Sequence, residues 1–553
     1  MPKNKETNFG SYFNLPNPGL RSYFDIVRKG QPDEYRTTFA KGNSLEEVLS
    51  DWEPHLEAIS KEWPTLLDFE NDLKAKVGPM SIMKPLSERM EDIDHYYDDI
   101  LLSSTPVSDT ALKAVVSEFS SVKGLRVRNQ QKTVDNMKKS TNSGSPYFTK
   151  RRDVIGKTIP VELRLYNKRN ADRDYPEVIQ LLNGSNPRCP GTVRSLRNDD
   201  GCWKACAVLG WRGQEGGPTD EDVKQRVVWM FPFGVNIREL QVYQPLIESC
   251  QKFNLVPAWV SMDAVDQRIT DMFDTKGVDD VVICTDFSKF DQHFNPDMSN
   301  AAHYILQKLL TDDAQSRDWL TSVFPIKYRI PLAYDYGMIR KGIHGMGSGS
   351  GGTNADETLV HRALQYEAAI SQHAMLNPNS QCLGDDGVLT YPGITVEDVV
   401  RSYSAHGQEM NTSKQYVSKQ DCVYLRRWHH MNYRVNNVCV GVYSTYRALG
   451  RLCEQERYYD PDVWSKEMVA LRQLSIIENV KWHPLREDFA EFCMKRDKYR
   501  LGLDIPGFLD DLDRISTEAT DLMPDFLGYT KSMAKDQEGI NSWWIVNYLK
   551  SKR

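Results

Sequence analysis

The N-terminal part of the chain has a helical pattern of apolar positions that is broken by prolines. Residues 43–75 predict helices that begin at Asn43 or Ser44 and are interrupted at Pro54 and Pro64, because proline lacks the amide hydrogen that a helix interior needs. Further helical patterns cover residues 107–122, residues 250–270 and most of the chain after Arg447, where the expected breaks are Pro461, Pro484, Pro506 and Pro524.

The central part combines strand-like and helical patterns. Residues 279–286 (DDVVICTD) are rich in β-branched residues, which is typical of a buried strand, and a helix is expected from about Pro296. A loop of Gly and Ser at residues 345–352 precedes a helical stretch over residues 353–374, and two strand-like runs then flank a tight turn at residues 384–387. This order predicts an α+β fold with carboxylates at strand ends.

The composition is that of an ordinary globular protein. The chain has 553 residues, of which 40% are hydrophobic and 26% charged, so we expect two to four subdomains around more than one hydrophobic cluster. The ten cysteines include no CxxC pair, which argues against structural zinc and against a disulfide framework. No run of about 18 apolar residues occurs, so we expect a soluble, intracellular-type protein without a membrane partner.

Charge is segregated along the sequence, although the formal net charge is only -7. Residues 41–120 contain 17 acidic and 7 basic residues, whereas residues 121–170 contain 13 basic and 3 acidic residues. The basic segment could attract a polyanion such as a nucleic acid, because salt at about 0.15 M screens charges beyond about 8 Å. It could equally be a solvated face that pairs with the acidic segment.

Two adjacent carboxylates, Asp385 and Asp386, follow Gly384 in the predicted hairpin turn. Like charges this close repel each other unless a cation compensates them, which favours a divalent metal ion. Carboxylate ligands suit Mg²⁺ or Mn²⁺. An exposed Asp-Asp-Gly turn is the alternative, and the short motif alone does not decide between the two.

Two more aspartates follow the predicted strand at residues 279–286. Asp286 ends the strand and can reach the hairpin turn if the strands are neighbours, whereas Asp291 lies further along a cleft. Asp286 and Asp385 could then bridge two metal ions about 3.5 to 4 Å apart, as in enzymes that transfer phosphoryl groups by in-line displacement. Taken alone, Asp286 could also be an ordinary turn residue after a strand.

The segment GMGSGSGGTNADETL allows three interpretations. It could be a flexible linker, and Gly347, Gly349 and Gly352 satisfy the GxGxxG pattern of dinucleotide-binding proteins. That pattern also requires an acidic residue after a second strand about 20 residues on, and the stretch is helical instead. The loop precedes a helix, whose N-terminal amides favour a phosphate group or a nucleic-acid backbone.

The order of these motifs resembles that of viral RNA-dependent RNA polymerases. DxxxxD at residues 286–291 is similar to their motif A, SGxxxT at residues 348–353 to motif B, and GDD at residues 384–386 to motif C. The specific motifs cover about residues 140–430, and the whole chain is similar to the polymerases of picobirnaviruses and, more distantly, of partitiviruses.

The resemblance implies a right-hand fold of fingers, palm and thumb, closed into a ring by fingertips, with an antiparallel sheet at the core of the palm. The implied parts are an N-terminal extension that bridges fingers and thumb (1–80), fingers (81–250 and 298–340), palm (251–297 and 341–433) and thumb with the C-terminal tail (434–553).

The resemblance also implies roles for the motif residues. Asp286 and Asp385 would be the principal ligands of two Mg²⁺ or Mn²⁺ ions, and Asp386 would support them. Ser348 and Gly349 would form a mobile loop at the template and the nascent base pair.

Selection of ribonucleotides is assigned to a second set of residues. Asp291 would recognise the ribose 2′-hydroxyl, with help from Thr353 and Asn354. Many positive-strand viral polymerases have Asn four residues after the motif B threonine, where this chain has Glu357. Whether Asn354 or Glu357 contacts Asp291 is therefore open.

Further similarities assign basic residues to phosphate groups. Lys224 and Arg226 resemble motif F, which clamps the incoming triphosphate. Lys414 resembles the motif D lysine that protonates the leaving pyrophosphate, with Lys419 as a rival. Each of them could instead be a solvated surface charge.

Other residues are assigned to RNA. Thr141, Gly144 and Pro146 resemble motif G at the template entrance, and Arg427 lies where motif E would grip the nascent strand. Aromatic residues among the basic ones could stack on bases, although most are expected in the core; they are Tyr147, Phe148, Trp203 and Trp211.

The C-terminal tail contains Trp543, Trp544 and Tyr548, which is much apolar surface for a terminus. We hypothesise that the tail, or a loop within residues 450–553, enters the catalytic cleft and offers an aromatic platform for starting chains without a primer.

Together these features predict a template-directed RNA polymerase that joins nucleoside triphosphates at two metal ions. The resemblance adds replication and transcription of a double-stranded RNA genome, in a virion interior or host cytoplasm. It implies a monomer that binds RNA template and product, with a viral capsid protein as a candidate partner. Two alternatives stay open: a catalytically idle RNA-binding or capsid-associated protein, and a reverse transcriptase or metal-dependent nuclease.

Overall fold

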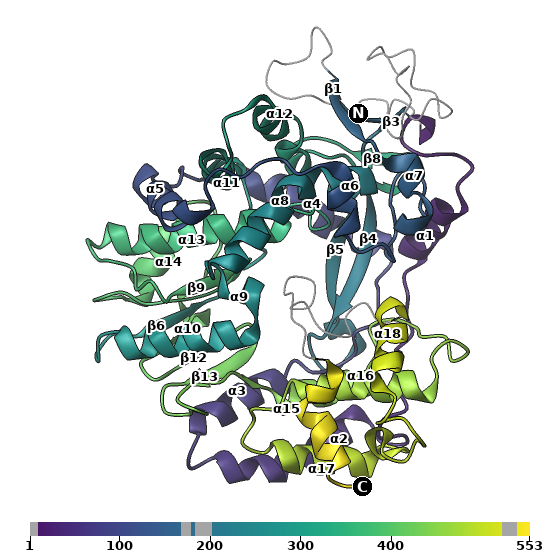
Figure 1. The fold of residues 1–553 in the computed structure, drawn as a ribbon, viewed down its shortest axis with the longest axis vertical. Coiled ribbons are helices and arrows are strands. Elements are labelled where there is room, and N and C mark those ends of the chain that lie inside the picture. The colour runs from purple at the N-terminus through teal and green to yellow at the C-terminus, as the bar shows by residue number, and fades with distance from the viewer. Residues whose placement is uncertain (1–8, 167–177, 183–201, 523–538) are drawn as a thin grey trace.

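The structure is a computed structural model that describes residues 9–166, 178–182, 202–522 and 539–553. Figure 1 shows its helices and strands in three groups around the middle of the molecule. The described elements combine helices with largely antiparallel sheets, which confirms the predicted α+β class.

A four-stranded antiparallel sheet lies in the group that contains the predicted strand and hairpin. Its order is β11 (Tyr416–Ser418), β6 (Val282–Thr285), β10 (Asp386–Leu389) and β9 (Gln381–Leu383). Side chains alternate between its two faces. Ile283 and Leu389 belong to one hydrophobic cluster with α13 (Thr353–Ser371), whereas Val282 and Val388 belong to another with α10 (Met262–Thr275).

A second four-stranded sheet lies in another group, with α8 (Phe233–Lys252) nearby (Figure 1). Its order is β5 (Lys224–Met230), β4 (Ala207–Gln214), β7 (Leu332–Asp335) and β8 (Met338–Arg340), and only the β4–β7 pair is parallel. The remaining sheets are β1 (Glu162–Tyr166), β2 (Val178–Leu182) and β3 (Cys202–Lys204), and β12 (Asp421–Tyr424), β13 (Arg427–His430) and β14 (Val442–Tyr443).

The third group is helical and joins the two ends of the chain. Helices α2 (Leu45–Leu56) and α3 (Pro64–Lys74) share one hydrophobic cluster with the C-terminal helices. Those helices are α15 (Thr445–Cys453), α16 (Lys466–Glu478), α17 (Arg486–Arg496), α18 (Leu512–Leu522) and α20 (Trp544–Lys550). The other helices are α1 (Pro18–Lys29), α4 (Met90–Asp98), α5 (Asp109–Glu118), α6 (Gln130–Asp135), α7 (Ile155–Thr158), α9 (Pro257–Val260), α11 (Pro296–Leu309), α12 (Ala314–Ser322) and α14 (Val396–Ser404).

Local sequence signals account for most of these element ends. Ser44 caps α2 by accepting a hydrogen bond from the Glu47 amide, and Pro64 is the first residue of α3, as expected. The prediction that Pro54 ends the helix is wrong, since α2 continues two residues further, to Leu56. Residues 250–270 are not one helix, because α9 begins at Pro257 and Ser261 caps the start of a further helix, α10. The break expected at Pro524 lies outside the described residues.

The described core consists of four hydrophobic clusters, which confirms the expectation of more than one. No helix in the described part of the chain is long and apolar enough to span a membrane. Eight of the cysteines within the described residues are free, buried thiols.

Ion pairs do not join the basic segment 121–170 to the acidic segment 41–120 among the residues that the structure describes. Arg128 of the basic segment pairs instead with Glu248 on α8. The acidic segment has partners elsewhere too, since Glu118 pairs with Arg362. The pairing of the two segments, one reading of the charge pattern, is therefore not found.

Candidate active site

Strand pairing brings the sequence-predicted aspartates together. The β9–β10 hairpin turns at Gly384 and Asp385, and β10 pairs with β6 so that Gly387 lies opposite Thr285. The next position along this antiparallel pair places Asp386 beside Asp286. Both Asp286 and Asp385 are exposed to solvent at the same end of the sheet.

Helix α13 fixes the hairpin turn from behind. Thr358 accepts a hydrogen bond from the Gly384 amide at 2.9 Å, and His361 Nδ1 lies 2.8 Å from the Gly384 carbonyl oxygen. Gly387 must lack a side chain, because a Cβ there would lie 2.6 Å from the His361 ring. The hairpin turn that carries Asp385 and Asp386 is therefore anchored to helix α13.

Burial and like charge raise the pKa values of the turn carboxylates. The pKa of Asp386 is raised to about 7, first by burial and then by the charge of Asp385. Desolvation raises the pKa of Asp385, because the surrounding protein excludes part of the water around its carboxylate even though the residue reaches solvent. The charge of Asp286 adds to this effect. Arg226 and Arg426 oppose the shift at Asp385. The cluster is therefore a place where added positive charge is stabilising.

The donor set fits a hard divalent cation. Asp286 and Asp385 offer carboxylate oxygens, whereas one oxygen of Asp386 is occupied by the Leu425 amide at 2.9 Å. No group of three or more His, Cys, Asp or Glu side chains among the described residues is arranged to hold a metal ion. Two carboxylates still suffice for Mg²⁺, which typically completes its shell with water and substrate phosphates.

Asp291 forms a carboxyl–carboxyl hydrogen bond with Glu357. Glu357 is only 5% exposed, and burial together with the charge of Asp291 raises its pKa well above its usual range. Two carboxyl groups bond in this way only if they share a proton, so Glu357 is the neutral donor and Asp291 the acceptor. Asn354 is engaged elsewhere, since its Oδ1 accepts a hydrogen bond from Trp259 Nε1 at 2.8 Å. The residue that contacts Asp291 is therefore Glu357.

The Gly and Ser loop packs on strand β5. The Ser348 hydroxyl accepts a hydrogen bond from the Trp229 amide at 3.3 Å, and Thr353 Oγ1 donates to the Gly347 carbonyl at 2.9 Å. A Cβ at Gly349 would lie 1.7 Å from the Trp229 carbonyl oxygen, so the close approach requires glycine. Strand β5 also contains the exposed Lys224 and Arg226. The same strand therefore positions the loop and these two basic residues.

The basic residues have different surroundings. Arg226 lies near the acids, since its charge affects the pKa values of both Asp291 and Asp385. Burial lowers the pKa of Lys224, and the negative charge of Asp286 partly opposes this shift. Lys414 is exposed in the segment that leads into β11.

Arg427 does not have the place expected for an RNA contact. It is 8% exposed, and its guanidinium binds both carboxylate oxygens of Asp266, at 2.9 and 3.2 Å, and the Gly441 carbonyl at 3.0 Å. Its hydrogen-bonding groups are thus used inside the protein, and the assignment of Arg427 to the nascent strand is corrected. The neighbouring Arg426 is exposed instead.

The motif G residues lie where the basic segment meets the N-terminal part of the chain. Gly144 has a positive φ of 62°, and a Cβ there would lie 2.5 Å from the Phe231 carbonyl oxygen. The Pro146 carbonyl accepts a hydrogen bond from Asn17 Nδ2 at 3.1 Å. The Thr141 carbonyl accepts one from the Arg151 amide at 3.0 Å. Phe148 and Trp203 are buried in the core, as expected for most of the aromatic candidates.

The end of the chain does not enter this site. Residues 544–550 form α20, whose Ile545, Val546 and Leu549 are fully buried among the C-terminal helices. The hypothesis that the tail residues Trp543, Trp544 and Tyr548 reach the catalytic cleft is therefore wrong, because they pack against the same helical cluster. Residues 523–538 lie outside the described part.

Sequence reasoning missed two residues that position the acids. Gln415 is buried and clamps Asp286, since its Oε1 accepts from the Asp286 amide at 2.7 Å and its Nε2 donates to the Asp286 carbonyl at 2.9 Å. Leu425 holds Asp386 through its backbone amide. The only sequence signal for Gln415 is its place next to Lys414. Leu425 gives no sequence signal, because it acts through its backbone amide.

Comparisons with known proteins agree with this geometry. Residues 81–436 match the family described as viral RNA-dependent RNA polymerase. A protein of human picobirnavirus (strain Human/Thailand/Hy005102/-), described as a potential RNA-dependent RNA polymerase, is 61% identical over 552 residues, 99% of each chain. Two crystal structures of the RNA-dependent RNA polymerase of a human picobirnavirus are also similar. One has a TM-score of 0.91 and 60% identity; the other, an insertion loop deletion mutant, has a TM-score of 0.89 and 58% identity. Each match covers 99% of this chain and 100% of the other.

Proposed function

The chain belongs to the viral RNA-dependent RNA polymerase family, and from this premise we propose that Asp286 and Asp385 are the catalytic carboxylates of its nucleotidyl transfer. It is an RNA-dependent RNA polymerase with the right-hand α+β fold of its relatives. The observation that carries the proposal is the β6–β10 pairing, which sets Asp286 beside the turn at Asp385.

Two divalent metal ions, Mg²⁺ or Mn²⁺, would be held by Asp286 and Asp385, with Asp386 in support. When bound, such ions activate the attacking 3′-hydroxyl and stabilise the charge on the leaving pyrophosphate. Gln415 keeps the backbone of Asp286 in place, and the Leu425 amide holds one carboxylate oxygen of Asp386. The acids are therefore preorganised before substrate binds.

The remaining residues act on the nucleotide and the RNA. Lys224 and Arg226 would clamp the incoming triphosphate from β5, and Lys414 is the candidate proton donor to pyrophosphate. Asp291, held by Glu357, would accept a hydrogen bond from the ribose 2′-hydroxyl, with help from Thr353 and Asn354 at the start of α13. Ser348 and Gly349 would line the base pair that is being formed, and Thr141, Gly144 and Pro146 the path of the template.

The broader role is also a proposal. Similarity to picobirnavirus enzymes supports replication and transcription of a double-stranded RNA genome. We also propose that the enzyme acts as a monomer, in the virion interior or the host cytoplasm. A capsid protein is the candidate partner. Initiation without a primer stays part of the proposal, although the tail residues 539–553 do not supply the platform.

Labelled nucleotide incorporation on a single-stranded RNA template tests the proposal. We expect Asp385→Ala to reduce incorporation about 1000-fold or more, because it removes several kcal/mol of charge stabilisation. Asp385 is exposed at a turn, so the variant should keep the melting temperature of the wild type. Full activity of a folded Asp385→Ala chain would refute the assignment, and a preference for dNTPs would revive the reverse transcriptase alternative.

A further inference from the structure

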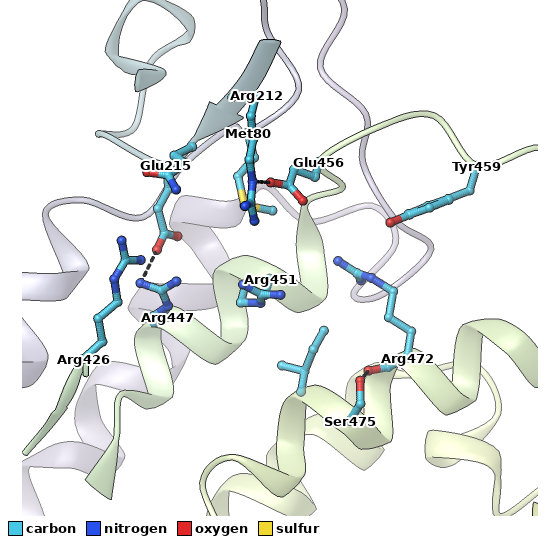
Figure 2. Close-up of a pocket in the computed structure, with 13 residues that line it drawn as sticks. Met80, Arg212, Glu215, Arg426, Arg447, Arg451, Glu456, Tyr459, Arg472 and Ser475 are labelled. Carbon is cyan, nitrogen blue, oxygen red and sulfur yellow. Dashed lines mark hydrogen bonds and ion pairs between the residues drawn. The ribbon is translucent and has the colours of Figure 1, made fainter. Parts of the chain in front are cut away.

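Charged side chains also gather away from the proposed catalytic acids. In the pocket of Figure 2, Arg212 pairs with Glu456 and Arg447 pairs with Glu215. A different arrangement is found where α8 contacts the Gly and Ser loop. There the carboxylate of Glu239 is fully buried and faces the loop rather than a pocket.

One face of α8 carries the residues that contact the loop. Asn236, Glu239 and Tyr243 follow one another at intervals of three and four residues, and therefore share this face. A Cβ at Gly352 would lie 2.2 Å from Cε2 of the Tyr243 ring. The loop backbone can thus approach the helix only without a side chain at Gly352, and this approach brings the loop within reach of Glu239.

Both carboxylate oxygens of Glu239 accept hydrogen bonds from the loop. Oε2 accepts one from the Ser350 hydroxyl, and Oε1 accepts one from the Gly351 amide at 3.1 Å. Ser350 Oγ itself accepts a hydrogen bond from the Gly352 amide at 3.0 Å, so its own proton is left for Glu239. Donors face both oxygens, an arrangement that suits the ionised carboxylate.

A buried lysine compensates the charge of Glu239. Burial raises the pKa of Glu239, and the positive charge of Lys327 and the hydrogen bonds from the loop oppose this shift. Lys327 is also fully buried, and its Nζ lies 3.0 Å from Asp356 Oδ2 in the first turn of α13. The Lys327 carbonyl accepts a hydrogen bond from the Gly347 amide at 3.1 Å. These buried charges therefore hold the start of the loop, its middle and the helix that follows it.

Asn236 extends the contact to the residues that resemble motif G. Its Nδ2 donates to Glu239 Oε1 at 3.0 Å and to the Gly349 carbonyl at 3.2 Å. Its Oδ1 accepts a hydrogen bond from Arg151 Nη2 at 2.9 Å. The Arg151 amide in turn donates to the Thr141 carbonyl at 3.0 Å. A continuous path of hydrogen bonds thus joins the segment of Thr141 to the Gly and Ser loop.

We propose that Glu239 is a positioning residue of the polymerase reaction, which holds the Gly and Ser loop in place and, through Asn236 and Arg151, couples the loop to the template entrance. The places of the loop at the new base pair and of the motif G residues at the template rest on the proposed function. A loop held in this way keeps the template base and the incoming nucleotide in register. Glu239 therefore acts on kcat and on the choice of nucleotide, and not on the triphosphate, which the basic residues of β5 would clamp.

Steady-state incorporation of matched and mismatched nucleotides on a primed RNA template tests the role of Glu239. We expect Glu239→Gln to lower kcat for the matched nucleotide about tenfold at unchanged KM, because the NH₂ group of glutamine must face one of the donors and frees the loop. The ratio of kcat/KM for matched over mismatched nucleotides should fall about fivefold, because discrimination depends on how well the new base pair is held.

Glu70→Gln is the matched control. Glu70 is likewise a fully buried acid, and it accepts hydrogen bonds from the amide and the hydroxyl of Thr445, far from the loop in the sequence and in another hydrophobic cluster. Melting curves check that both variants are folded. A ratio in folded Glu239→Gln equal to that of the control would overturn the proposal. An equal loss of matched and mismatched incorporation would also overturn it, because a purely structural role predicts that result.

Ser350→Ala tests the same contact from the side of the loop and leaves α8 unchanged. We expect this variant to lower the ratio as well. The double variant Glu239→Gln/Ser350→Ala should be no worse than Glu239→Gln alone, because two residues that act through one contact are not additive. Effects of the two substitutions that multiply in the double variant would contradict the proposal.

A second pair of substitutions tests the link to the template entrance. Arg151→Met removes the hydrogen bond to Asn236, and its effect on kcat should be smaller in the Glu239→Gln background than in the wild type. Arg152→Met is the control, because it removes the same charge from the exposed neighbouring residue, and its effect should be the same in both backgrounds. An effect of Arg151→Met that is also the same in both backgrounds would refute the coupling.

Failure of this proposal can be told apart from failure of the proposed catalytic acids. Asp385→Ala should remove the incorporation of matched and mismatched nucleotides alike, whereas Glu239→Gln should change their ratio. If Asp385→Ala stayed active, the assignment of the acids would fail, and the ratio measured for Glu239→Gln would still decide the role of Glu239.

Discussion

The carboxyl groups of Asp291 and Glu357 face each other beside the proposed catalytic acids, and the raised pKa of Glu357 favours its neutral form. Burial raises the pKa of Glu357 most, and the charges of Asp291, Asp385 and Asp356 add to this effect, while the charge of Arg226 lowers the pKa of Asp291. A neutral Glu357 can donate one hydrogen bond to Asp291 and leave its second oxygen for a sugar hydroxyl. Glutamate here can thus do the work of a neutral amide.

Substitutions at Glu357 test this role. We expect Glu357→Gln to keep the ratio of kcat/KM for ribonucleotides over deoxynucleotides within about threefold of the wild type, because the amide still donates. Glu357→Leu should lower the ratio at least about tenfold, because Asp291 loses its donor.

The ratio separates positioning from a purely structural role, since a general loss of folding or chemistry lowers both rates together. Glu397→Gln and Glu397→Leu are matched controls on the exposed surface of α14. An unchanged ratio in Glu357→Leu would contradict the prediction.

Glu70 is a buried acid in the helical group and links α3 to α15. It accepts hydrogen bonds from the amide and hydroxyl of Thr445, and its neighbour His483 is buried and its pKa is lowered to about 3. Burial raises the pKa of Glu70 to about 7 from its ordinary 4.5. The folded state therefore binds the proton more tightly than the unfolded state.

The pKa shift of Glu70 predicts a pH-dependent stability. As pH rises from about 4.5 to about 7, Glu70 progressively destabilises the folded state, by up to about 3 kcal/mol once it is fully ionised. Glu70→Gln should gain stability relative to the wild type over this interval. Urea unfolding of both chains at several pH values measures the difference, and a difference that does not change with pH would contradict the assignment.

At the scale of elements, the loop and β5 form one unit. The fit between Gly349 and the Trp229 carbonyl leaves no room for a methyl group, so a side chain at this position would push the loop away from the strand. The loop connects directly to α13, which holds both the hairpin turn and Glu357. A shift of the loop is therefore transmitted to the sugar contact.

Gly349→Ala should displace the loop from β5. We expect incorporation to fall about 100-fold, because a displacement of about 1 Å in a positioning element has effects of this size. Gly156→Ala is the control, since a Cβ at Gly156 meets nothing within 4 Å. Activity of Gly349→Ala equal to that of the control would show that the loop does not position substrate.

Elements with strong local signals were predictable from the sequence, and those set by tertiary contacts were not. The Asp286 strand, the Gly384 hairpin and the helix after Gly352 all follow from periodicity and turn residues. The β12–β13 turn does not, because Leu425 and Arg426 both adopt positive φ without Gly or Asn. Its register decides that Arg427 points into the core, and this explains the error at Arg427.

At the scale of the whole molecule, the two ends of the chain complete one core. Trp52 on α2 is fully buried and its Nε1 donates to Thr445 Oγ1 at 2.8 Å, at the start of α15. Figure 1 shows α2 and α3 beside α15 and α17. Composition could predict several clusters, but it could not tell which distant segments share one.

The C-terminal helix α20 belongs to this shared core, so its loss should affect stability rather than initiation. The Trp544 and Ile545 amides donate to Glu478 on α16, at 3.0 and 2.9 Å, and Tyr548 donates to Glu491 on α17 at 2.7 Å. Deletion of residues 539–553 also removes the fully buried side chains of Ile545, Val546 and Leu549 and exposes the apolar surface that they cover. Burial of each such side chain stabilises the fold by about 1.5 to 3 kcal/mol.

We therefore expect the truncated chain to melt several degrees lower, and to start RNA chains without primer as the full chain does at a temperature where both are folded. Leu549→Ala, which keeps every aromatic residue of the tail, should reproduce the loss of stability in part. If truncation instead abolished primer-independent initiation at an unchanged melting temperature, the tail would have to leave its dock on α16 and α17 to act at the acids. That displacement would expose the buried apolar side chains of α20 and lose the stability that they provide. We therefore expect α20 to stay docked while the enzyme works.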